Sequence, residues 1–352
     1  MSYTITNYGD KSFYNRCFHS METNVINSLA NCYNVESKQI ILTSSGIEAL
    51  SILLQTIMIS NNFKKINIFY SNELYCDSPR IIKYFSEIYG CFELFKFDVE
   101  KSNDFVKLIT NNYKDSINII LMESCSNPSG KIFDFEQLQT IKSNTTNTKI
   151  IIDNTWLTHV CFNPFKYAVD FIFCSTSKHY SGGNCIGGFI AGPLNFMTHV
   201  YKFKVVNGKH ISLPYTEILN NNIQLMENRI ITAYHKTLEI AKFMNNSDNY
   251  ITINYPLLEG NKSYNLYNKY FKHGPCVFSF IINLNRHDSV EWMKSFKNIT
   301  YKTSFGSKET KFDCWPVSKS KNKTQIRLAI GYESNVKDII NELQNNPPII
   351  NN

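Results

Sequence analysis

The hydrophobic positions along the chain form two kinds of short segment, which alternate through its first two thirds. Runs rich in β-branched and aromatic residues, such as KINIFY at 65–70 and INIILME at 117–123, are typical of buried strands. Helical spacing of apolar residues follows each of the first four runs. This alternation predicts an α/β domain with a seven-stranded, mostly parallel sheet covered on both faces. The other predicted strands are 38–43, 92–98, 149–153, 170–175 and 186–192, and the predicted helices are 46–59, 78–90, 103–113 and 135–143.

The last third of the chain has a different pattern. A long helical pattern at 217–244 is predicted to connect two domains. Beyond it, strand-like and helical segments alternate at 276–284, 289–296, 325–331 and 336–344, which predicts a smaller C-terminal α+β domain. The expected divisions are an N-terminal arm at 1–40, a large domain at 41–230 and a small domain at 231–352.

The composition is that of a globular protein. Apolar residues make up 43% of the 352 positions and charged residues 18%, which supplies a sizeable core and argues against disorder. No apolar run approaches the roughly 20 residues of a membrane-spanning helix, and the first residues lack the apolar stretch of a signal peptide. We therefore expect a cytoplasmic protein that is neither secreted nor embedded in a membrane.

Cysteine spacing and charge distribution argue against two further classes. Ten cysteines occur without a C-x-x-C pair or regular spacing, which predicts buried thiols rather than a zinc site or a disulfide framework. The formal net charge is +7, but the basic residues are scattered, and KSKNK at 319–323 is the one dense cluster. This distribution disfavours a nucleic-acid surface.

Polar residues follow several of the predicted strands, where open parallel sheets collect their ligands. Ser45, Gly46 and Ile47 stand between a strand and a helix, where backbone N–H groups and the helix dipole favour an anion such as phosphate. A serine and a glycine before a helix are also an ordinary helix cap, so both interpretations stay open. The other strand-end candidates are Tyr75, Asn127, Asp153, Ser175, Ser177 and Lys178.

The stretch CSTSKHYSGG places Lys178 after a strand, between hydroxyl residues and a glycine cluster. Asp153 ends the run KIIID one strand earlier, so the pair could form a structural salt bridge or share a ligand. Ser175 and Ser177 could donate to the same phosphate as Gly46 or satisfy loop carbonyls. All these side chains are predicted at one end of one sheet, which favours a ligand site.

Several motifs resemble those of the pyridoxal-phosphate (PLP) enzymes of cysteine and methionine metabolism, in the family's order and along nearly the whole chain. FYNR resembles the family's Y-x-R, SSGIEAL its S-G-M phosphate loop and ELYCDS its L-Y-G-G-T. NPSG, DNT and QIRLAIGYE resemble N-P-T, D-N-T and R-x-S-x-G-x-E. The family includes cystathionine γ-synthase, cystathionine γ-lyase and methionine γ-lyase. The resemblance implies the PLP-dependent transferase fold, type I, with pyridoxal 5'-phosphate as the cofactor.

The resemblance also implies roles for the strand-end residues. Lys178 would be the Schiff-base lysine and the acid/base catalyst beside the substrate's Cα and Cβ. Asp153 would keep the pyridine nitrogen protonated, so that the ring accepts electrons when Cα loses its proton. Tyr75 would lie over the ring face and assist proton movements. Contacts with the cofactor phosphate are implied for Ser45, Gly46, Ile47, Ser175 and Ser177. Asn127 would contact the ring hydroxyl of the cofactor, and the alternative for it is a routine Asn-Pro turn.

The N-terminal motif carries an implication about assembly. In the resemblance, Tyr14 and Arg16 bind the phosphate of a neighbouring subunit's cofactor, so the sites are shared within a homodimer or homotetramer. An ordinary polar N-terminal segment is the alternative.

Three residues are implied in substrate binding. Arg327 would bind the substrate α-carboxylate through its planar guanidinium, unless it is a surface strand residue. Ser304 would lie beside the substrate and the lysine. Arg80 resembles an arginine that cystathionine γ-synthases and γ-lyases use for a distal carboxylate, or is an exposed helix residue. Thr303 stands where those enzymes commonly have glutamate, so the two signals of specificity disagree.

The function implied is elimination or replacement at the γ or β carbon of a sulfur-containing or O-acylated amino acid, most similar to cystathionine γ-lyase or γ-synthase. Cys76, Asp77 and Gly183 depart from the family's motifs, but none of these changes removes a cofactor-anchoring group. The alternative is a PLP-binding scaffold or regulatory protein that has lost catalysis. An aminotransferase on the same fold is a third candidate.

Overall fold

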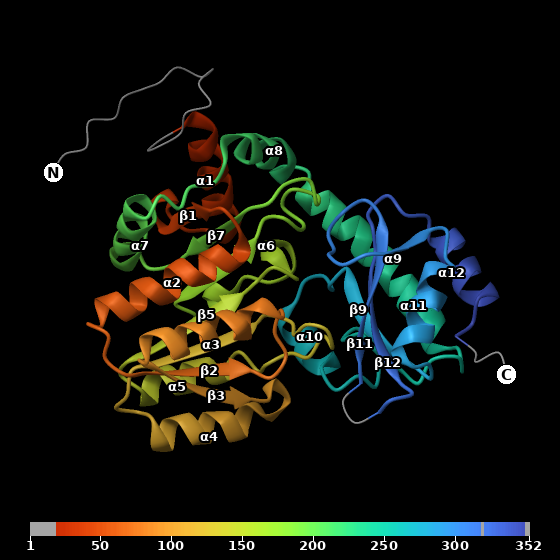
Figure 1. The fold of residues 1–352 in the computed structure, drawn as a ribbon, viewed down its shortest axis with the longest axis horizontal. Coiled ribbons are helices and arrows are strands. Elements are labelled where there is room, and N and C mark those ends of the chain that lie inside the picture. The colour runs from red at the N-terminus through yellow and green to blue at the C-terminus, as the bar shows by residue number, and fades with distance from the viewer. Residues whose placement is uncertain (1–18, 318–319, 349–352) are drawn as a thin grey trace.

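The computed structural model describes residues 19–317 and 320–348, which form two domains side by side (Figure 1). The larger domain contains seven strands: β1 (Ile40–Thr43), β2 (Ile66–Ser71), β3 (Phe92–Phe97), β4 (Asn118–Glu123), β5 (Thr148–Asp153), β6 (Phe171–Ser175) and β7 (Gly188–Ala191). Their order in the sheet is β1-β7-β6-β5-β4-β2-β3. The central strands β2 to β6 are parallel, and β7 is antiparallel to both β6 and β1. The predicted seven-stranded, mostly parallel sheet is confirmed.

Helices cover both faces of this sheet, as the unbroken apolar runs require. In β4 all six residues are buried: Ile119 and Leu121 face one hydrophobic cluster, and Ile120 and Met122 face another. One cluster includes side chains of α2 (Gly46–Ser60), α3 (Asp77–Tyr89) and α7 (Leu194–Val206). The other includes side chains of α1 (Ser20–Tyr33), α4 (Ser102–Asn112), α5 (Gln137–Asn144), α6 (Thr158–Cys161) and α8 (Leu213–Ile223).

The smaller domain is a five-stranded sheet with helices, and the predicted C-terminal α+β unit is confirmed. Its strands are β8 (Thr252–Asn254), β9 (Val277–Ile282), β10 (Ile299–Tyr301), β11 (Thr310–Pro316) and β12 (Thr324–Ala329), in the order β10-β11-β12-β9-β8. Its helices are α9 (Met226–Asn245), α10 (Tyr264–Tyr270), α11 (Arg286–Lys294) and α12 (Val336–Asn345). Figure 1 shows α9, α11 and α12 beside the sheet.

The single helix predicted at 217–244 is wrong, because the chain breaks between α8 and α9. At the break, the carbonyl of Asn222 accepts the backbone N–H of Leu225 at 3.1 Å and Nη2 of Arg229 at 2.9 Å. A cation at the end of a helix satisfies such a carbonyl and interacts favourably with the helix dipole. Arg229 therefore stabilises a corner that helical spacing alone does not reveal.

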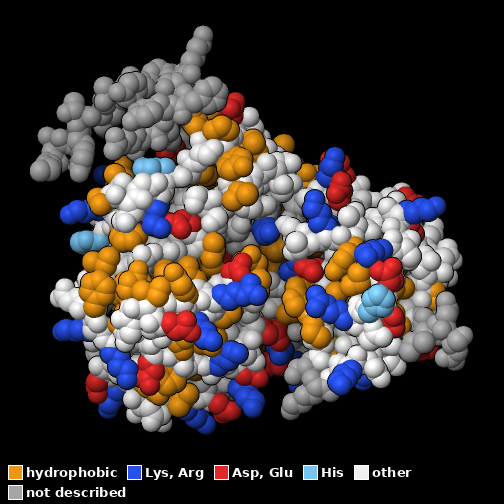
Figure 2. All heavy atoms as spheres, viewed as in Figure 1, with side chains coloured by type: hydrophobic (Ala, Val, Ile, Leu, Met, Phe, Trp, Pro, Cys, Tyr) orange, Lys and Arg blue, Asp and Glu red, His pale blue; other side chains and the backbone are white. Residues whose placement is uncertain are grey.

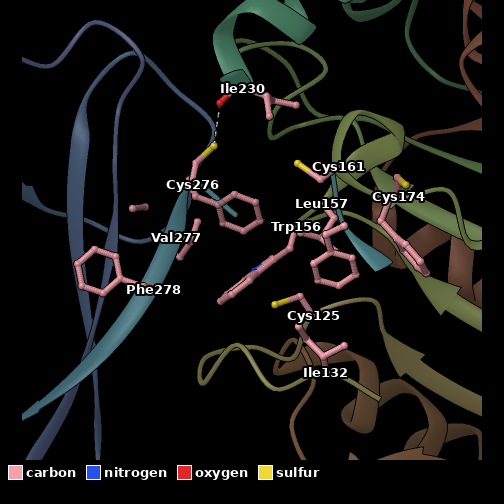
Figure 3. Close-up of a cluster of buried hydrophobic side chains, with 14 of the residues drawn as sticks. Cys125, Ile132, Trp156, Leu157, Cys161, Cys174, Ile230, Cys276, Val277 and Phe278 are labelled. Carbon is pink, nitrogen blue, oxygen red and sulfur yellow. Dashed lines mark hydrogen bonds between the residues drawn. The ribbon is translucent and has the colours of Figure 1, made fainter. Parts of the chain in front are cut away.

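The two domains share one hydrophobic cluster. Figure 3 shows Cys276, Val277 and Phe278 of the small domain on one side, with Trp156 and Cys161 of the large domain opposite. The Cys276 thiol donates to the Ile230 carbonyl at 3.5 Å. Packing of this kind fixes how the domains meet, so that side chains from both can form one site. The cysteines of the described residues are free thiols.

The surface has no dominant charge on the face that Figure 2 shows, since Lys and Arg side chains are interspersed with Asp and Glu over both domains. Within residues 19–317 and 320–348, no helix is long and apolar enough to cross a membrane.

We predict that the aromatic cluster beside β3, β4 and α4 carries much of the large domain's stability. Phe133 is fully buried, with its ring centroid 6.2 to 6.3 Å from those of Phe97, Phe105 and Phe135. Phe133→Ala should lower the free energy of unfolding by about 3–5 kcal/mol, measured by denaturant titration. Phe63, with 54% of its surface exposed, is the matched control, and Phe63→Ala should change the free energy of unfolding by about 0.5 kcal/mol or less. Equal effects would contradict this assignment of the core.

Candidate active site

A pocket lies where β4, β5 and β6 end, and a loop of the small domain at 302–309 closes one side of it. Open parallel sheets bind ligands at this edge because the carboxyl ends of their strands meet there. The lining residues are Ser45, Gly46, Ile47, Tyr75, Ser78, Glu123, Asn127, Asp153, Thr155, Trp156, Phe173, Ser175, Ser177, Lys178, Ile186 and Phe305. All nine of the strand-end and helix-cap candidates named from the sequence lie in this lining. They are Ser45, Gly46, Ile47, Tyr75, Asn127, Asp153, Ser175, Ser177 and Lys178.

Lys178 projects into the pocket from the loop after β6. Its Nζ donates to the hydroxyl of Ser304 at 2.8 Å and lies 5.4 Å from the ring centroid of Phe305. Burial, followed by the cations of Arg327 and Lys311, lowers the pKa of Lys178 to about 8. A lysine with this pKa has an appreciable neutral fraction at physiological pH, which makes the amine a nucleophile and a base.

Ser304 comes to the lysine from the small domain with a left-handed backbone, φ 89°. A non-glycine residue in this region is strained, and such strain persists where the surroundings impose it. The contact between Ser304 and Lys178 therefore joins the two domains directly at the reactive amine.

Asp153 lies at the end of β5, buried on the pocket floor. Its Oδ1 accepts the backbone N–H of Thr155 at 2.9 Å and the Thr155 hydroxyl at 2.5 Å. Burial raises the pKa of Asp153 to about 6, against the Thr155 hydrogen bonds and the Lys178 charge, which favour the ionised form. At neutral pH this carboxylate is ionised and lines the pocket together with Lys178.

Glu123 is the direct neighbour of Asp153 across the β4–β5 ladder. Its Oε1 accepts the backbone N–H of Tyr75 at 2.5 Å, and its buried Oε2 has no partner among the described residues. Burial, and then the charge of Asp153, raises the pKa of Glu123 far above its ordinary value. Two adjacent carboxyls cannot both ionise in such a place, so Glu123 holds the proton and Asp153 the charge.

The turn before α2 forms the other end of the pocket. Ser45 caps the helix, with its hydroxyl accepting the N–H of Glu48 at 3.1 Å, so the cap interpretation is correct for this side chain. The N–H groups of the first helical turn have no intrahelical partner and can bind an anion. A Cβ on Gly46 would lie 2.8 Å from the Cβ of Ser175, so only glycine allows β6 to approach this turn.

The serines of the lysine loop make backbone contacts in the structure. The Ser177 hydroxyl donates to the carbonyl of Gly187 at 3.3 Å and accepts its N–H at 3.1 Å. The backbone N–H of Ser175 donates to the Thr155 hydroxyl at 2.9 Å. Both serines nonetheless line the pocket beside Gly46.

Arg327 lies on β12, buried, and faces the large domain. Its Nη1 donates to Oδ1 of Asn127 and its Nη2 to Oδ2 of Asp313, each at 3.2 Å. The guanidinium also lies 5.7 Å from the ring centroid of Phe305 and 5.0 Å from that of Trp315. Arg327 is therefore no surface strand residue, and it reaches the pocket through Asn127.

One predicted position falls outside this cluster, and two others cannot be compared with it. Arg80 lies on α3 with 76% of its side chain exposed and binds Asp77, whereas the pocket lining does not include it. Tyr14 and Arg16 lie outside the described residues.

Sequence reasoning missed Glu123, Thr155 and Phe305. Glu123 ends the run INIILME and satisfies the strand-end rule that identified Asp153. Thr155 belongs to the quoted DNT, and Phe305 follows Ser304 in SFGS. No group of three or more His, Cys, Asp or Glu side chains within the described ranges could hold a metal ion.

These residues fit PLP. The helix N-terminus suits its phosphate, the ionised Asp153 suits a ring nitrogen, and the amine of Lys178 suits its aldehyde. Apolar side chains, Trp156 and Phe173, supply the walls that a flat ring requires.

Comparisons with known proteins agree with this chemistry. Residues 5–346 match the family model described as Cys/Met metabolism PLP-dependent enzyme. An L-methionine gamma-lyase of Fusobacterium nucleatum is 24% identical over 319 residues, covering 86% of this chain and 78% of that protein. A cystathionine beta-lyase of Schizosaccharomyces pombe is 25% identical over 277 residues, covering 78% of this chain and 68% of that protein.

A solved structure shares the fold. The crystal structure of cystathionine gamma synthase from Xanthomonas oryzae pv. oryzae, in complex with aminoacrylate and cysteine, covers 98% of this chain. The covered share of that chain is 90%, with a TM-score of 0.84 and 18% sequence identity. The fold is therefore PLP-dependent transferase type I, and the chain belongs to the Cys/Met metabolism PLP-dependent enzymes, whose cofactor is pyridoxal phosphate.

Proposed function

We propose that this protein catalyses elimination or replacement at the γ or β carbon of a sulfur-containing or O-acylated amino acid. The observation that carries the proposal is that Lys178 and Asp153 line one pocket built by both domains, and that Arg327 is hydrogen-bonded to Asn127 of the same lining. These are a nucleophilic amine, a buried carboxylate and a guanidinium for an amino acid's carboxylate. An inactive scaffold has no need to keep all three.

Cofactor binding is assigned to the two ends of the pocket. The N–H groups of Gly46 and Ile47 would hold the phosphate, with Ser45, Ser175 and Ser177 as neighbouring donors. Asp153 would bind the ring nitrogen, Tyr75 would cover the ring, and Asn127 would reach the ring hydroxyl. When bound, PLP supplies an electron sink that stabilises negative charge at the substrate's Cα.

The proton transfers are assigned to Lys178. With substrate and PLP bound, the amine of Lys178, which lies against Ser304, would accept the Cα proton. Its lowered pKa favours the neutral form that this step requires. The same nitrogen would then hold the proton close to Cβ and the leaving group.

Substrate binding is assigned to Arg327. Asn127 and Asp313 fix its guanidinium, and a planar guanidinium binds a carboxylate through two parallel hydrogen bonds. Ser304 would contact the substrate on the lysine side. This arrangement orients the Cα–H bond toward Lys178.

The leaving group is proposed to be a thiol or an acid expelled from the γ carbon, as in cystathionine γ-lyase or γ-synthase. The names of the relatives, methionine gamma-lyase and cystathionine beta-lyase, support carbon–sulfur cleavage as the common chemistry. Elimination would release a 2-oxo acid and ammonia, and replacement would join cysteine to the same carbon skeleton.

A shared site in a homodimer or homotetramer is also proposed. Among the described residues that line the pocket, Lys178 is the one cation, and it is bound to Ser304. A phosphate dianion binds more tightly where an arginine neutralises its charge. Arg16 of a second subunit, together with its Tyr14, would supply that charge.

Lys178→Ala tests the reaction. Loss of the amine should abolish the visible absorbance of the bound cofactor and lower kcat by about 100-fold or more, because nucleophile and base are both removed. The assay offers cystathionine, methionine, cysteine and an O-acylated homoserine, and measures thiol and 2-oxo acid. Lys83→Gln, an exposed lysine of α3, is the control and should be active. Cofactor binding by the wild type without release from any substrate would favour the scaffold alternative.

Glu123→Gln tests which carboxyl holds the proton. The folded pKa of Glu123 lies above its ordinary value of 4.5, so wild-type stability should fall as pH rises through this range, because ionisation is easier in the unfolded chain. Gln is neutral at every pH and can still accept the N–H of Tyr75. Denaturant titrations should therefore show Glu123→Gln equal to wild type at about pH 4, where the carboxyl is protonated in both states, and more stable at about pH 9.

Glu123→Leu is the matched variant, because it leaves the N–H of Tyr75 unsatisfied. Compared with Glu123→Gln, it should be less stable by about 1–3 kcal/mol at both pH values. If Glu123→Gln were the less stable protein at about pH 9, the carboxyl would be ionised and the proton assignment wrong.

Mixing two inactive variants tests the shared site. Lys178→Ala and Arg16→Ala should each be inactive alone at limiting cofactor. After unfolding and refolding together in equal amounts, roughly a quarter of the sites of a two-fold assembly combine an intact Lys178 with an intact Arg16. Activity should recover to about that fraction of wild type. No recovery, with mixed assemblies present on a sizing column, would place both residues in the same subunit's site.

A further inference from the structure

The hydroxyl of Tyr75 is bound by Asp77 at the start of α3, and Asp77 is in turn paired with Arg80. It donates to Oδ2 of Asp77 at 2.9 Å, and Oδ1 of the same carboxylate accepts Nη1 of Arg80 at 2.9 Å. Asp77 is the first residue of the helix, where the dipole favours an anion, and Arg80 follows one turn later. Both oxygens of Asp77 are therefore engaged, one by the phenol and one by the guanidinium.

Tyr75 is thus fixed at two points. Glu123 accepts its backbone N–H at 2.5 Å, and Asp77 accepts its hydroxyl. The other charged or titratable groups that act on it are the neighbouring Cys76, Arg80, and Arg327 of β12. Among these, Asp77 alone forms a hydrogen bond with the phenol.

The negative partner has a clear chemical effect. Partial burial, and then the hydrogen bond to Asp77, raises the pKa of Tyr75 to about 12, because a carboxylate that accepts a phenol's proton stabilises the protonated phenol. The positive charge of Arg80 acts in the opposite direction, because a cation favours the phenolate. The hydroxyl of Tyr75 therefore donates to Asp77, while the side chain is one of those that line the pocket.

We propose that Asp77 is a positioning residue for Tyr75, and that Arg80 serves the site by fixing Asp77 rather than by binding the substrate. The inference rests on the proposed function, in which Tyr75 covers the cofactor ring. It gives the departure at Asp77 and the arginine at position 80 a common purpose: the pair sets the direction of the tyrosine side chain and keeps its hydroxyl protonated.

The first test follows the tyrosine itself and needs no turnover. In the full-chain holoenzyme, tyrosinate absorbance is titrated between about pH 9 and 12.5, and each protein is compared with the same protein carrying Tyr75→Phe. Asp77→Asn should lower the pKa of Tyr75 by about one unit, because the negative partner is gone. Lys83→Gln removes another exposed ion pair of α3 and should leave it unchanged. An unchanged titration in Asp77→Asn would overturn the proposal.

The second test separates positioning from substrate binding. Arg80→Gln should lower kcat several-fold and by the same factor for methionine and for cystathionine, with KM unchanged, because the tyrosine acts on both. A rise in KM confined to cystathionine, the substrate with a distal carboxylate, would overturn the proposal and assign Arg80 to the substrate. If neither substrate reacts with the wild type, the proposed function fails, and the tyrosine titration still decides the role of Asp77.

Discussion

The site depends on the register of three parallel strands. The ladder between β4 and β5 places Glu123 opposite Asp153, and the ladder between β5 and β6 places Asp153 opposite Phe173, a few residues before Lys178. A slip of one residue in β5 would turn the Asp153 side chain to the other face of the sheet. The buried isoleucines at 150–152 alternate between the two hydrophobic clusters and so hold this register. Packing of apolar side chains thus determines where the buried charge lies.

The negative charge of the buried Asp153 is stabilised by the hydrogen-bond donors and the lysine around it. Glu123 is neutral, Asp153 accepts two hydrogen bonds from Thr155, and Lys178 lies on the same pocket. Burying an unpaired carboxylate in an apolar pocket would otherwise be costly. The arrangement leaves an acid, an anion and an amine in one small volume, each with a different affinity for protons. A family of enzymes that moves protons between carbon and nitrogen requires such differences.

Much of the large domain could be predicted from the sequence because its strands are continuous apolar runs, and the strand-end rule then found Asp153 and Lys178. The same rule applies to Glu123, but only the β4–β5 register reveals that it borders Asp153. Arg327 and Ser304 were found through resemblance to a family, since no local pattern says which face of β12 meets the other domain. The break between α8 and α9 could not be predicted, because helical spacing of apolar residues continues across it, and the contact of Arg229 with the Asn222 carbonyl leaves no pattern in the sequence.

Arg229 also contacts the loop that carries Lys178. Besides Asn222, its Nη2 binds the carbonyls of His179 and Tyr180, the two residues after the reactive lysine, at 3.1 and 3.3 Å. One guanidinium therefore joins the start of the helix that enters the small domain to the loop that carries the chemistry. Among inactive variants of this protein we would expect substitutions of Arg229 as well as substitutions in the pocket, although Arg229 is not one of the residues that line the pocket. Natural variation there would be constrained by geometry and not by contact with substrate.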